Sequence, residues 1–232
     1  MDSLGTSSDI AVAGTVRFQR FKRHFDKKHY PLLGEEEQSK PVLNTRSCRS
    51  ALGPILSVPV PIAIDWLRNS KGRWHYPVNG ADLVYPGVYL GDAPTALCTR
   101  ILKEMGVTAV VNCGQGELTE WNYVNTGPAY YKMVNMDFLG LPAVDLPSYD
   151  ISQHFNVAAD FIQKIVGSEG KVLVHCVQGI SRSATIVLAY MMMKKNLTIK
   201  ESIDQVKSIR SIAPNEGFMM QLIMLNDQIH KL

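Results

Sequence analysis

The sequence predicts an α/β fold in which helices pack against a sheet. Two segments, 107–112 (VTAVVN) and 171–175 (KVLVH), are rich in β-forming residues and largely apolar, as buried strands are. Between them, 151–166 carries apolar residues at helical spacing. Strands that alternate with helices are typical of an α/β fold, whose functional site lies at the carboxyl ends of the strands.

The first elements predicted in the folded part of the chain are a strand and a helix. The strand is 88–90 (VYL), and Asp92 and Pro94 after it are typical of a helix start. This helix is expected to bury one face against the sheet. The face is predicted to consist of Leu97, Ile101 and Met105.

Strands and helices then alternate toward the middle of the chain. The strand at 107–112 is followed by a second strand region at 130–139, and the helix at 151–166 leads to the strand at 171–175. The core face of that helix is predicted to hold Ile151, Phe155, Ala158, Ile162 and Ile165.

Three helices are predicted to close the chain. The first is 181–195, and the second begins at a capping box formed by Thr198 and Glu201. The last follows Pro214 and Asn215. Its core face is predicted to hold Phe218, Leu222, Leu225 and Ile229.

Composition narrows the classes of function. Hydrophobic residues make up 46% and charged residues 19% of the chain, so it can bury a core. The net charge of +3 is too small to indicate nucleic-acid binding, and four cysteines are too few for a disulfide scaffold or a zinc cluster. The longest apolar run, 184–193, is about half a membrane span. The sequence therefore predicts a globular protein without stable membrane insertion, located in the cytoplasm and also in the nucleus.

The chain is predicted to divide into a mobile extension, 1–57, and one domain, 58–232, because only the second part has sustained hydrophobic periodicity. The segment 17–30 of the extension places three phenylalanines at helical spacing among six Lys and Arg residues. A solvated basic tail, an amphipathic helix for a membrane or a partner, and a nuclear-import patch all fit this pattern.

The most informative segment, 175–183 (HCVQGISRS), leads from a predicted strand into a helix. Its turn through Gly179 leaves successive backbone N–H groups without strand or helix partners, and such groups form an anion-binding nest beside a helix N-terminus. Cys176 lies at the mouth of this nest, where its thiolate is stabilised. The planar guanidinium of Arg182 can hold two oxygens of a tetrahedral dianion.

A cysteine and an arginine in this context predict that a thiolate attacks phosphorus while amides and a guanidinium hold the equatorial oxygens. The structural alternative is a buried cysteine at a strand end together with a surface arginine. Besides Arg182, the residues expected to surround the phosphate are His175, Val177, Gln178, Gly179, Ile180 and Ser181.

The residues VHCVQGISRSAT resemble the signature of the cysteine-dependent protein tyrosine phosphatase superfamily. The flanking SRSATIVLAYMM and the later PNEGF resemble the small, vaccinia-H1-related-like atypical dual-specificity phosphatases, and the likeness extends over 60–231. It implies a three-layer protein-tyrosine-phosphatase-like fold with a central, mostly parallel sheet flanked by helices. It also implies a dual-specificity protein phosphatase that forms and hydrolyses a phosphocysteine on Cys176, without a metal or an organic cofactor.

The resemblance further implies roles for two neighbours of the nucleophile. Ser183 would donate a hydrogen bond to the Cys176 sulfur and make it a better leaving group in the second step. His175 would orient the loop and favour the thiolate, although a structural histidine at a strand end fits the sequence equally well.

Three aspartates, Asp137, Asp145 and Asp150, lie within range to protonate the leaving oxygen. Asp137 falls in a strand pattern and is expected to face solvent or to end the strand. Asp150 precedes a helix and has Gln153 three residues later, so an N-cap is its simplest role. Asp145 lies in the aperiodic segment GLPAVDLPSYD, at a separation from Cys176 similar to that in the family. It is the preferred general acid and base, with Asp150 as the alternative.

Two residues near the C-terminus are also candidates. By the resemblance, Arg210 lies beside the pocket and holds a second phosphate or an acidic substrate residue. The alternative is a solvated cation in the last turn of a helix. Asn215 is predicted to cap the final helix and to brace the loop.

Phosphoproteins are the expected partners, and nucleic acids are not. The region 60–231 has no room for the insertions that deepen the pocket of tyrosine-specific phosphatases, so phosphoserine/threonine is expected as a substrate beside phosphotyrosine. MAP kinases, docked through 27–33, and a second copy of the chain are further candidate partners. A non-catalytic phosphoprotein-binding module is the alternative function, and it is disfavoured because Cys176, Arg182 and Asp145 are all present.

Overall fold

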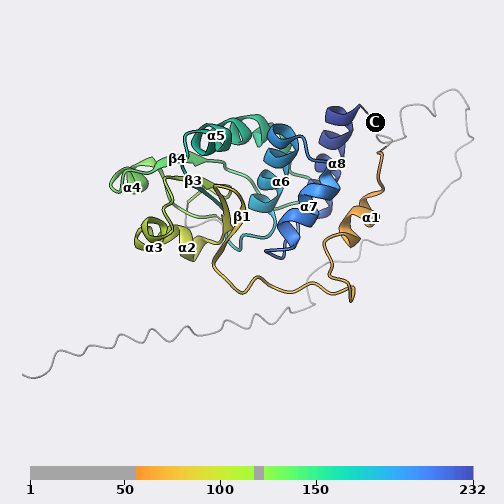
Figure 1. Cartoon of the computed structure of the whole chain (residues 1–232), viewed down its shortest axis with the longest axis horizontal. Helices are drawn as coiled ribbons and strands as arrows, with labels where there is room; N and C mark the ends of the chain where they lie inside the picture. The colour runs from red at the N-terminus through yellow and green to blue at the C-terminus, as the bar shows by residue number, and fades with distance from the viewer. Residues whose placement is uncertain (1–55, 118–122, 232) are drawn as a thin grey trace, which may run out of the picture. The chain divides into compact units, whose positions relative to one another are not determined.

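The computed structural model describes residues 56–117 and 123–231. Five strands form one sheet in the order β1-β2-β5-β3-β4 (Figure 1). β1 pairs antiparallel with β2, and all other neighbours are parallel, which confirms the predicted α/β class. The strands are β1 (Ala81–Tyr85), β2 (Val88–Gly91), β3 (Ala109–Asn112), β4 (Asp137–Gly140) and β5 (Val172–His175).

Helices cover both faces of the sheet, which gives the three layers implied by the resemblance (Figure 1). One face carries α2 (Ala93–Leu97), α3 (Thr99–Glu104) and α4 (Pro128–Lys132). The larger core on the other face includes α1 (Val60–Asp65), α5 (Phe155–Gly167), α6 (Arg182–Lys195), α7 (Ile199–Lys207) and α8 (Glu216–His230). Successive side chains of a strand point to opposite faces of the sheet, so they enter different cores. Val110 and Leu173 belong to the smaller core, and Val111 and Val174 belong to the larger one.

α6 runs through the larger core, where it packs against β5, α5, α7 and α8. Its residues 182–192 are all buried. A helix that is surrounded on every side has no polar face, which explains why the longest apolar run of the sequence, 184–193, lies here. The N-terminus of this helix follows directly on the loop that leaves β5.

The helix predicted after Asp92 consists of two short helices, α2 and α3, that meet at Cys98. Its start was predicted correctly, because the Asp92 side chain accepts a hydrogen bond from the Thr95 N–H at 3.0 Å. The predicted core face was wrong for two of its three residues, because Leu97 is 46% and Ile101 37% exposed, whereas Met105 packs against the smaller core. The break at Cys98 changes the helical phase between the two segments. The residues buried in their place are Ala96 and Leu102.

The region 130–139, predicted as a strand, contains the end of α4, a turn and β4. α4 begins at Pro128, whose fixed φ suits the first helical position. Tyr131 is fully buried, and its ring stacks on that of Phe138 with 5.3 Å between centroids. The aromatic residues Tyr131 and Phe138 contribute to the strand-like pattern of the region, but in the structure they pack α4 against β4. The sequence analysis also missed α1 and β1.

The later elements confirm the sequence analysis. β5 and the helices α5 to α8 occur in the predicted order, with the short 3-10 helix η1 (Ser152–His154) at the start of α5. Thr198 and Glu201 form the predicted capping box, in which each side chain accepts a hydrogen bond from the other residue's N–H. The Asn215 side chain caps α8 by accepting from the Phe218 N–H at 3.0 Å.

The predicted extension 1–57, with its segments 17–30 and 27–33, lies outside the described residues except for its last two. Leu56 packs against the larger core, and the Ser57 N–H donates a 2.9 Å hydrogen bond to an aspartate of α8. These two residues therefore make the first contacts of the described chain with the domain.

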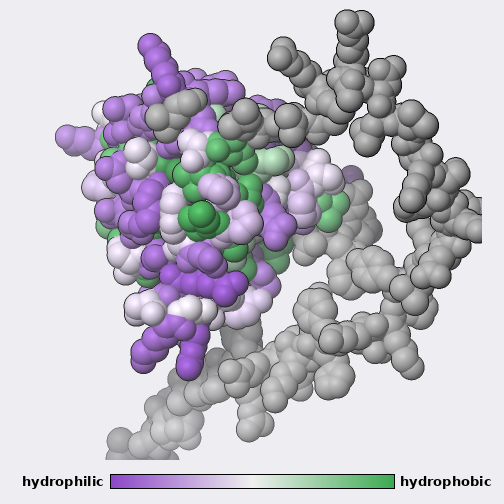
Figure 2. Space-filling view, turned by 90° about the vertical axis from the view of Figure 1, so that its right-hand side faces the viewer, coloured by the Kyte–Doolittle hydropathy of each residue, from purple (hydrophilic) through white to green (hydrophobic). Residues whose placement is uncertain are grey.

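On the face shown in Figure 2, polar side chains surround a patch of apolar side chains. A small apolar patch on a polar surface is common in globular proteins. In the part of the chain that the structure describes, no helix has the length and apolar character needed to cross a membrane.

Candidate active site

The loop between β5 and α6 forms a cradle around the side chain of Cys176. β5 ends at His175 and α6 begins at Arg182, so the whole candidate signature lies at the carboxyl end of a central strand. Gly179, in the middle of the loop, has a φ of +68°. A Cβ added to Gly179 would lie 2.3 Å from the carbonyl oxygen of Gly91, at the end of β2. Only glycine fits both the conformation and the space at this turn.

Four consecutive carbonyl groups of this cradle, 177–180, accept hydrogen bonds from outside it. The Ala93 N–H donates to the first at 3.1 Å, the Arg210 side chain to the next two at 3.3 and 3.0 Å, and the Ala213 N–H to the last at 2.7 Å. In a trans peptide the N–H points away from the preceding carbonyl. The N–H groups of 178–181 are therefore directed toward the inside of the cradle, as a nest for an anion requires.

The sulfur of Cys176 accepts two hydrogen bonds within the cradle, from the Gly179 N–H at 3.3 Å and from the Ser183 hydroxyl at 3.2 Å. Cys176 is only 2% exposed, and burial raises the pKa of its thiol. The Arg182 guanidinium, the hydroxyl and N–H of Ser183 and the N–H of Gly179 together outweigh burial, so the pKa of Cys176 is lowered. The arrangement favours a thiolate.

Arg182 connects the cradle to the segment that follows β4. Its Nη1 donates to the carbonyl oxygen of Ala143 at 3.0 Å, and its Nε lies 3.6 Å from Oδ2 of Asp145. The residue is 2% exposed, so the alternative of a surface arginine is wrong. The guanidinium acts electrostatically on the Cys176 sulfur and is also close to the carboxylate of Asp145.

Asp145 lies in the irregular segment 141–150, which reaches the rim of the cradle. Its Oδ1 accepts hydrogen bonds from the Ser181 hydroxyl at 2.7 Å and from the Asn215 side-chain amide at 3.0 Å. Asn215 therefore caps α8 with one side-chain atom and braces the Asp145 segment with another, as predicted. The Asp145 side chain is 26% exposed, so it is held in place and still reaches solvent.

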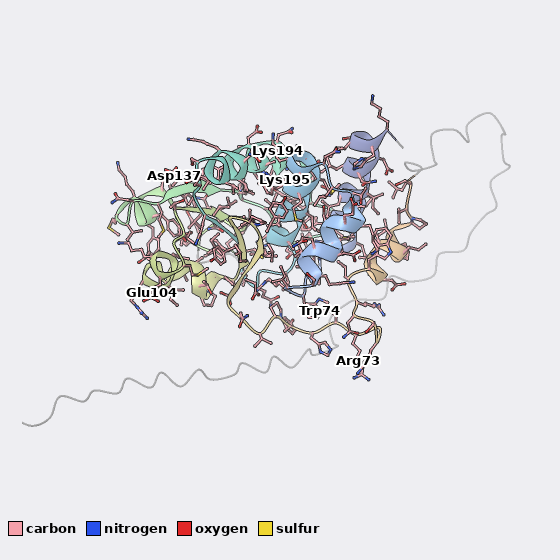
Figure 3. The ribbon with its side chains drawn as sticks, viewed as in Figure 1. Arg73, Trp74, Glu104, Asp137, Lys194 and Lys195 are labelled. Atoms are coloured by element: carbon pink, nitrogen blue, oxygen red, sulfur yellow. The ribbon has the colours of Figure 1, made fainter. Side chains whose placement is uncertain are left out.

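The other two candidate aspartates have structural surroundings. Asp137 begins β4, at the end of the sheet opposite the cradle, and it is exposed at the outer edge of the molecule (Figure 3). Asp150 accepts from the N–H and hydroxyl of Ser152 at 3.1 and 2.6 Å at the start of η1. Of the three, Asp145 is the one that contacts the cradle.

His175 is fully buried at the end of β5, where its Nδ1 lies 3.2 Å from the carbonyl oxygen of Cys176. Burial lowers the pKa of His175, and the Arg182 guanidinium lowers it further, whereas the contact with the Cys176 carbonyl raises it. The resulting pKa is about 4. The ring is therefore neutral near pH 7. A neutral ring can orient the cradle, but it places no positive charge beside the thiolate.

Cys113 follows β3 directly and lies beside the cradle, because its N–H donates to the His175 carbonyl at 2.8 Å. It is fully buried, and burial raises the pKa of its thiol well above the usual value. The nearby Cys176 raises it further. The two neighbouring cysteines thus differ chemically: Cys176 favours the thiolate and Cys113 keeps its proton.

Arg210 lies beside the cradle, as expected, but its surroundings differ from both expected roles. The residue is 2% exposed, so it is not a solvated cation. Its guanidinium donates to two cradle carbonyls, to the carbonyl of Asn79 and to Oδ2 of Asp82, the last at 2.7 Å. Because four of the five N–H groups of the arginine are used internally, the side chain is not open toward a second phosphate.

Two groups at this site were missed by the sequence analysis. Asp82 belongs to β1, and the alternating pattern ADLVY of that strand is a signal that was available. The Ala143 contact with Arg182 uses a backbone carbonyl. A backbone contact leaves no mark in the sequence.

No group of three or more His, Cys, Asp and Glu side chains that could hold a metal ion occurs in the two described stretches of the chain. The groups around Cys176 are instead hydrogen-bond donors: backbone amides, a hydroxyl and a guanidinium. Donors directed at one point stabilise anions, which here are a thiolate and a phosphate that approaches it.

Known proteins share this arrangement of sequence and fold. The family model described as "Dual specificity phosphatase, catalytic domain" matches residues 88–228. Human dual specificity protein phosphatase 26 is 43% identical over 154 residues, which are 66% of this chain and 70% of that protein. The crystal structure of human DUSP28 aligns with a TM-score of 0.57 and 28% identity, over 67% of this chain and 99% of that one.

A third likeness is to the human tyrosine phosphatase-like serine/threonine/tyrosine-interacting protein, with a TM-score of 0.54 and 26% identity, over 66% of this chain and 97% of that one. The family model covers more than half of the chain and includes the complete cradle. The chain belongs to the dual specificity phosphatase family, and it is a dual-specificity protein phosphatase.

Proposed function

We propose that this phosphatase hydrolyses phosphotyrosine and phosphoserine/threonine esters of proteins through a phosphocysteine intermediate on Cys176. One observation carries the proposal: the Cys176 sulfur accepts hydrogen bonds from the Gly179 N–H and the Ser183 hydroxyl, inside a loop whose amides face inward. These surroundings favour the thiolate, which is the nucleophilic form of cysteine.

In the first step, the Cys176 thiolate attacks the phosphorus of the bound ester. The inward N–H groups of 178–181 and the Arg182 guanidinium hold the equatorial oxygens, where negative charge develops in the transition state. Arg182 now donates to the Ala143 carbonyl and faces Asp145. A phosphate dianion competes with these two partners for the guanidinium, because a bidentate contact with phosphate is stronger.

Asp145 supplies the proton that the leaving oxygen needs. Its carboxyl group lies at the rim of the cradle, is partly exposed, and is held by the Ser181 hydroxyl and the Asn215 amide. A general acid has to be within hydrogen-bond reach of the oxygen that departs, and the rim is where that oxygen of the ester would lie.

In the second step, water attacks the phosphocysteine and the sulfur departs as a thiolate. Asp145, which has lost its proton in the first step, takes one from the water. The Ser183 hydroxyl, 3.2 Å from the sulfur, stabilises the departing thiolate. No metal ion or organic cofactor takes part in this scheme.

The proposal extends to the organisation of the chain. Residues 58–232 form the catalytic domain and 1–57 an N-terminal extension, and the protein acts in the cytoplasm and the nucleus. Phosphoproteins are the substrates, MAP kinases are candidates for docking through 27–33, and a second copy of the chain is a candidate partner. If deletion of 1–57 leaves kinase co-purification unchanged, the docking role is wrong.

A phosphatase assay with para-nitrophenyl phosphate tests the catalytic roles. We expect activity from the wild type and from Cys98→Ser, a matched control because Cys98 lies at the junction of α2 and α3. Cys176→Ser and Arg182→Met should lose more than about a thousandfold in kcat. Equally low rates for the wild type and Cys176→Ser would contradict hydrolysis and favour a phosphoprotein-binding module.

A substrate-trapping experiment tests the role of Asp145. Asp145→Ala removes the proton donor and leaves the cradle, so it should bind phosphoproteins from a lysate and release them to orthovanadate. Asp150→Ala is the matched control and should turn over substrate like the wild type. Trapping by Asp150→Ala, with normal turnover by Asp145→Ala, would transfer the role to Asp150.

A further inference from the structure

We propose that Arg210 and Asp82 are positioning residues that fix two peptide planes of the cradle so that their N–H groups face the reacting sulfur and phosphate. This role rests on the proposed function of the cradle. It differs from the second-phosphate site expected from the sequence, because the arginine acts here on the outer side of the loop.

Arg210 approaches the cradle from the turn after α7 and contacts its outer surface. Its Nε donates to the Gly179 carbonyl at 3.0 Å and its Nη2 to the Gln178 carbonyl at 3.3 Å. Nη1 donates to the Asn79 carbonyl at 2.9 Å and to Oδ2 of Asp82 at 2.7 Å. One buried guanidinium thus connects two successive loop carbonyls to the segment that leads into β1.

The two loop contacts determine which way two amides point. The carbonyl of Gln178 and the N–H of Gly179 belong to one planar trans peptide and point in opposite directions. With the Gln178 carbonyl on Arg210, the Gly179 N–H is directed inward, where it donates to the Cys176 sulfur at 3.3 Å. By the same geometry, the Gly179 carbonyl on Arg210 directs the Ile180 N–H toward the phosphate position.

The backbone at Gly179 packs closely against the guanidinium of Arg210. A Cβ on Gly179 would lie 2.8 Å from Nη2 of Arg210, as well as 2.3 Å from the Gly91 carbonyl. Because glycine is flexible, the planes on either side of Gly179 can rotate unless their carbonyls are held. Arg210 supplies that restraint from outside the cradle.

Asp82 holds the arginine and balances its charge. Its side chain is 12% exposed and that of Arg210 is 1% exposed, so the ion pair is largely shielded from water. The second carboxylate oxygen of Asp82 accepts from the Asn79 side-chain amide at 2.7 Å. A buried guanidinium without a carboxylate would be costly, and its position against the loop would be poorly defined.

Loss of this restraint has a specific chemical consequence. The Gly179 N–H is one of the groups that lower the pKa of Cys176, so a rotated plane raises that pKa. It also removes donors from the phosphate. A residue that served stability alone would change neither the thiol titration nor the affinity for an oxyanion.

The test compares Arg210→Lys with the wild-type chain. Lysine keeps a charge but has no planar fork to hold two carbonyls and a carboxylate at once. We expect the Cys176 pKa, from the pH dependence of iodoacetate alkylation, to rise. The inhibition constant of orthovanadate should rise at least about tenfold, and kcat/KM should fall by a similar factor. For comparison, removal of one oxyanion-hole donor lowers kcat by about 10²–10³ in other enzymes. Lys207→Met, which removes a cation that binds the Trp66 carbonyl, is the matched control and should match the wild type.

Asp82→Asn is the second variant and should shift the thiol pKa and vanadate affinity in the same direction by a smaller amount. A wild-type thiol titration and vanadate affinity in both variants, with only a lower melting temperature, would overturn the positioning role. Thiol titration does not require turnover. An inactive wild type would therefore refute the proposed function, whereas an active wild type with unchanged variants would refute this inference alone.

Discussion

At the scale of single residues, the pKa of a buried cysteine depends on the hydrogen-bond donors around its sulfur. Cys176 and Cys113 follow neighbouring strands and are both buried, yet the pKa of one is lowered and that of the other is raised. Burial acts in the same direction on both. Arg182 lowers the pKa of both thiols, so the difference comes from the donors of Ser183 and Gly179, which are directed at Cys176. Local hydrogen bonds, rather than depth in the protein, decide which of the two cysteines favours the thiolate.

Ser183→Ala tests one of these donors. Because the hydroxyl stabilises the thiolate that departs in the second step, kcat should fall about 10- to 100-fold, the value of one hydrogen bond to a charged group. The phosphoenzyme should then accumulate, which rapid mixing would detect as a burst of para-nitrophenol. Ser202→Ala is the control, since the Ser202 hydroxyl is buried without a partner in the described residues. A steady rate without a burst in Ser183→Ala would contradict the assignment.

His175 makes stability depend on pH. Its pKa is about 4 in the folded state and about 6.5 in the unfolded chain. Between these values the unfolded chain binds the additional proton, so stability is fully present above pH 6.5 and is lost as the pH falls toward 4. The loss should be roughly 3 kcal/mol by urea unfolding. His175→Gln should flatten this pH dependence of stability. His75→Gln, a control at an exposed position, should leave it unchanged. The same slope in the wild type and both variants would show that His175 is not the source of the pH dependence.

At the scale of elements, α8 is connected to the Asp145 segment through its N-cap residue, Asn215. Asn215 accepts from the Phe218 N–H and donates to Asp145, so one side chain both starts a helix and holds the proposed proton donor. Close packing supports this, because a Cβ on Gly217, in the first turn of α8, would meet the Pro147 carbonyl. The irregular segment 141–150 thus takes its position from the N-terminus of α8.

Two helix caps separate stability from activity. Asn215→Ala and Thr198→Ala each remove an N-cap and should each cost about 1 kcal/mol of unfolding free energy. Only Asn215→Ala should also lower kcat, by about tenfold, because it frees Asp145. Urea unfolding and para-nitrophenyl phosphate kinetics would measure both effects. Equal kcat values in the two variants would show that the Asn215 contact with Asp145 is dispensable.

The sequence predicted local features well and long-range partners poorly. The capping box of Thr198 and the Asn215 cap depend on residues three positions apart, so their signals are local. The region 130–139 was misassigned because Tyr131 packs on Phe138 across a turn. Arg210 was expected beside the pocket and lies there, but its burial was missed because its partner, Asp82, is 128 positions away in the chain. Burial and pairing of this kind arise only once the sheet has formed.

At the scale of the whole molecule, a mostly parallel sheet brings distant segments to one edge. The cradle follows β5, the Asp145 segment follows β4, and Asp82, which binds Arg210, lies in β1. Residues from both outer strands or the segments after them therefore contact the central loop or the arginine that binds it. The sequence predicted this arrangement at the level of fold class, because alternating strands and helices place functional loops at the carboxyl ends of strands.

Truncation tests whether this assembly is complete in the predicted domain. A protein of residues 58–232 should hydrolyse para-nitrophenyl phosphate with kcat/KM within about twofold of the full chain, because every cradle contact found in the described residues lies within 58–232. Residues 56–232 are the matched control, which keeps Leu56 against the core. The shorter protein should melt about 2–4 °C lower if that contact contributes about 1 kcal/mol. Loss of activity in both would show that the extension belongs to the catalytic unit.

The burial of α6 on all sides also predicts how amide hydrogen exchange should differ between parts of the site. Amide protons of 183–192 should exchange with deuterium only when the entire domain unfolds, whereas those of the irregular stretch 141–150 can exchange through local fluctuations. The cradle of Cys176 thus precedes the most enclosed helix of the domain, whereas Asp145 lies in an irregular segment that side-chain contacts hold in place. If the exchange rates differ as expected, the proposed phosphate site keeps its shape during local openings of the segment that carries the proposed proton donor.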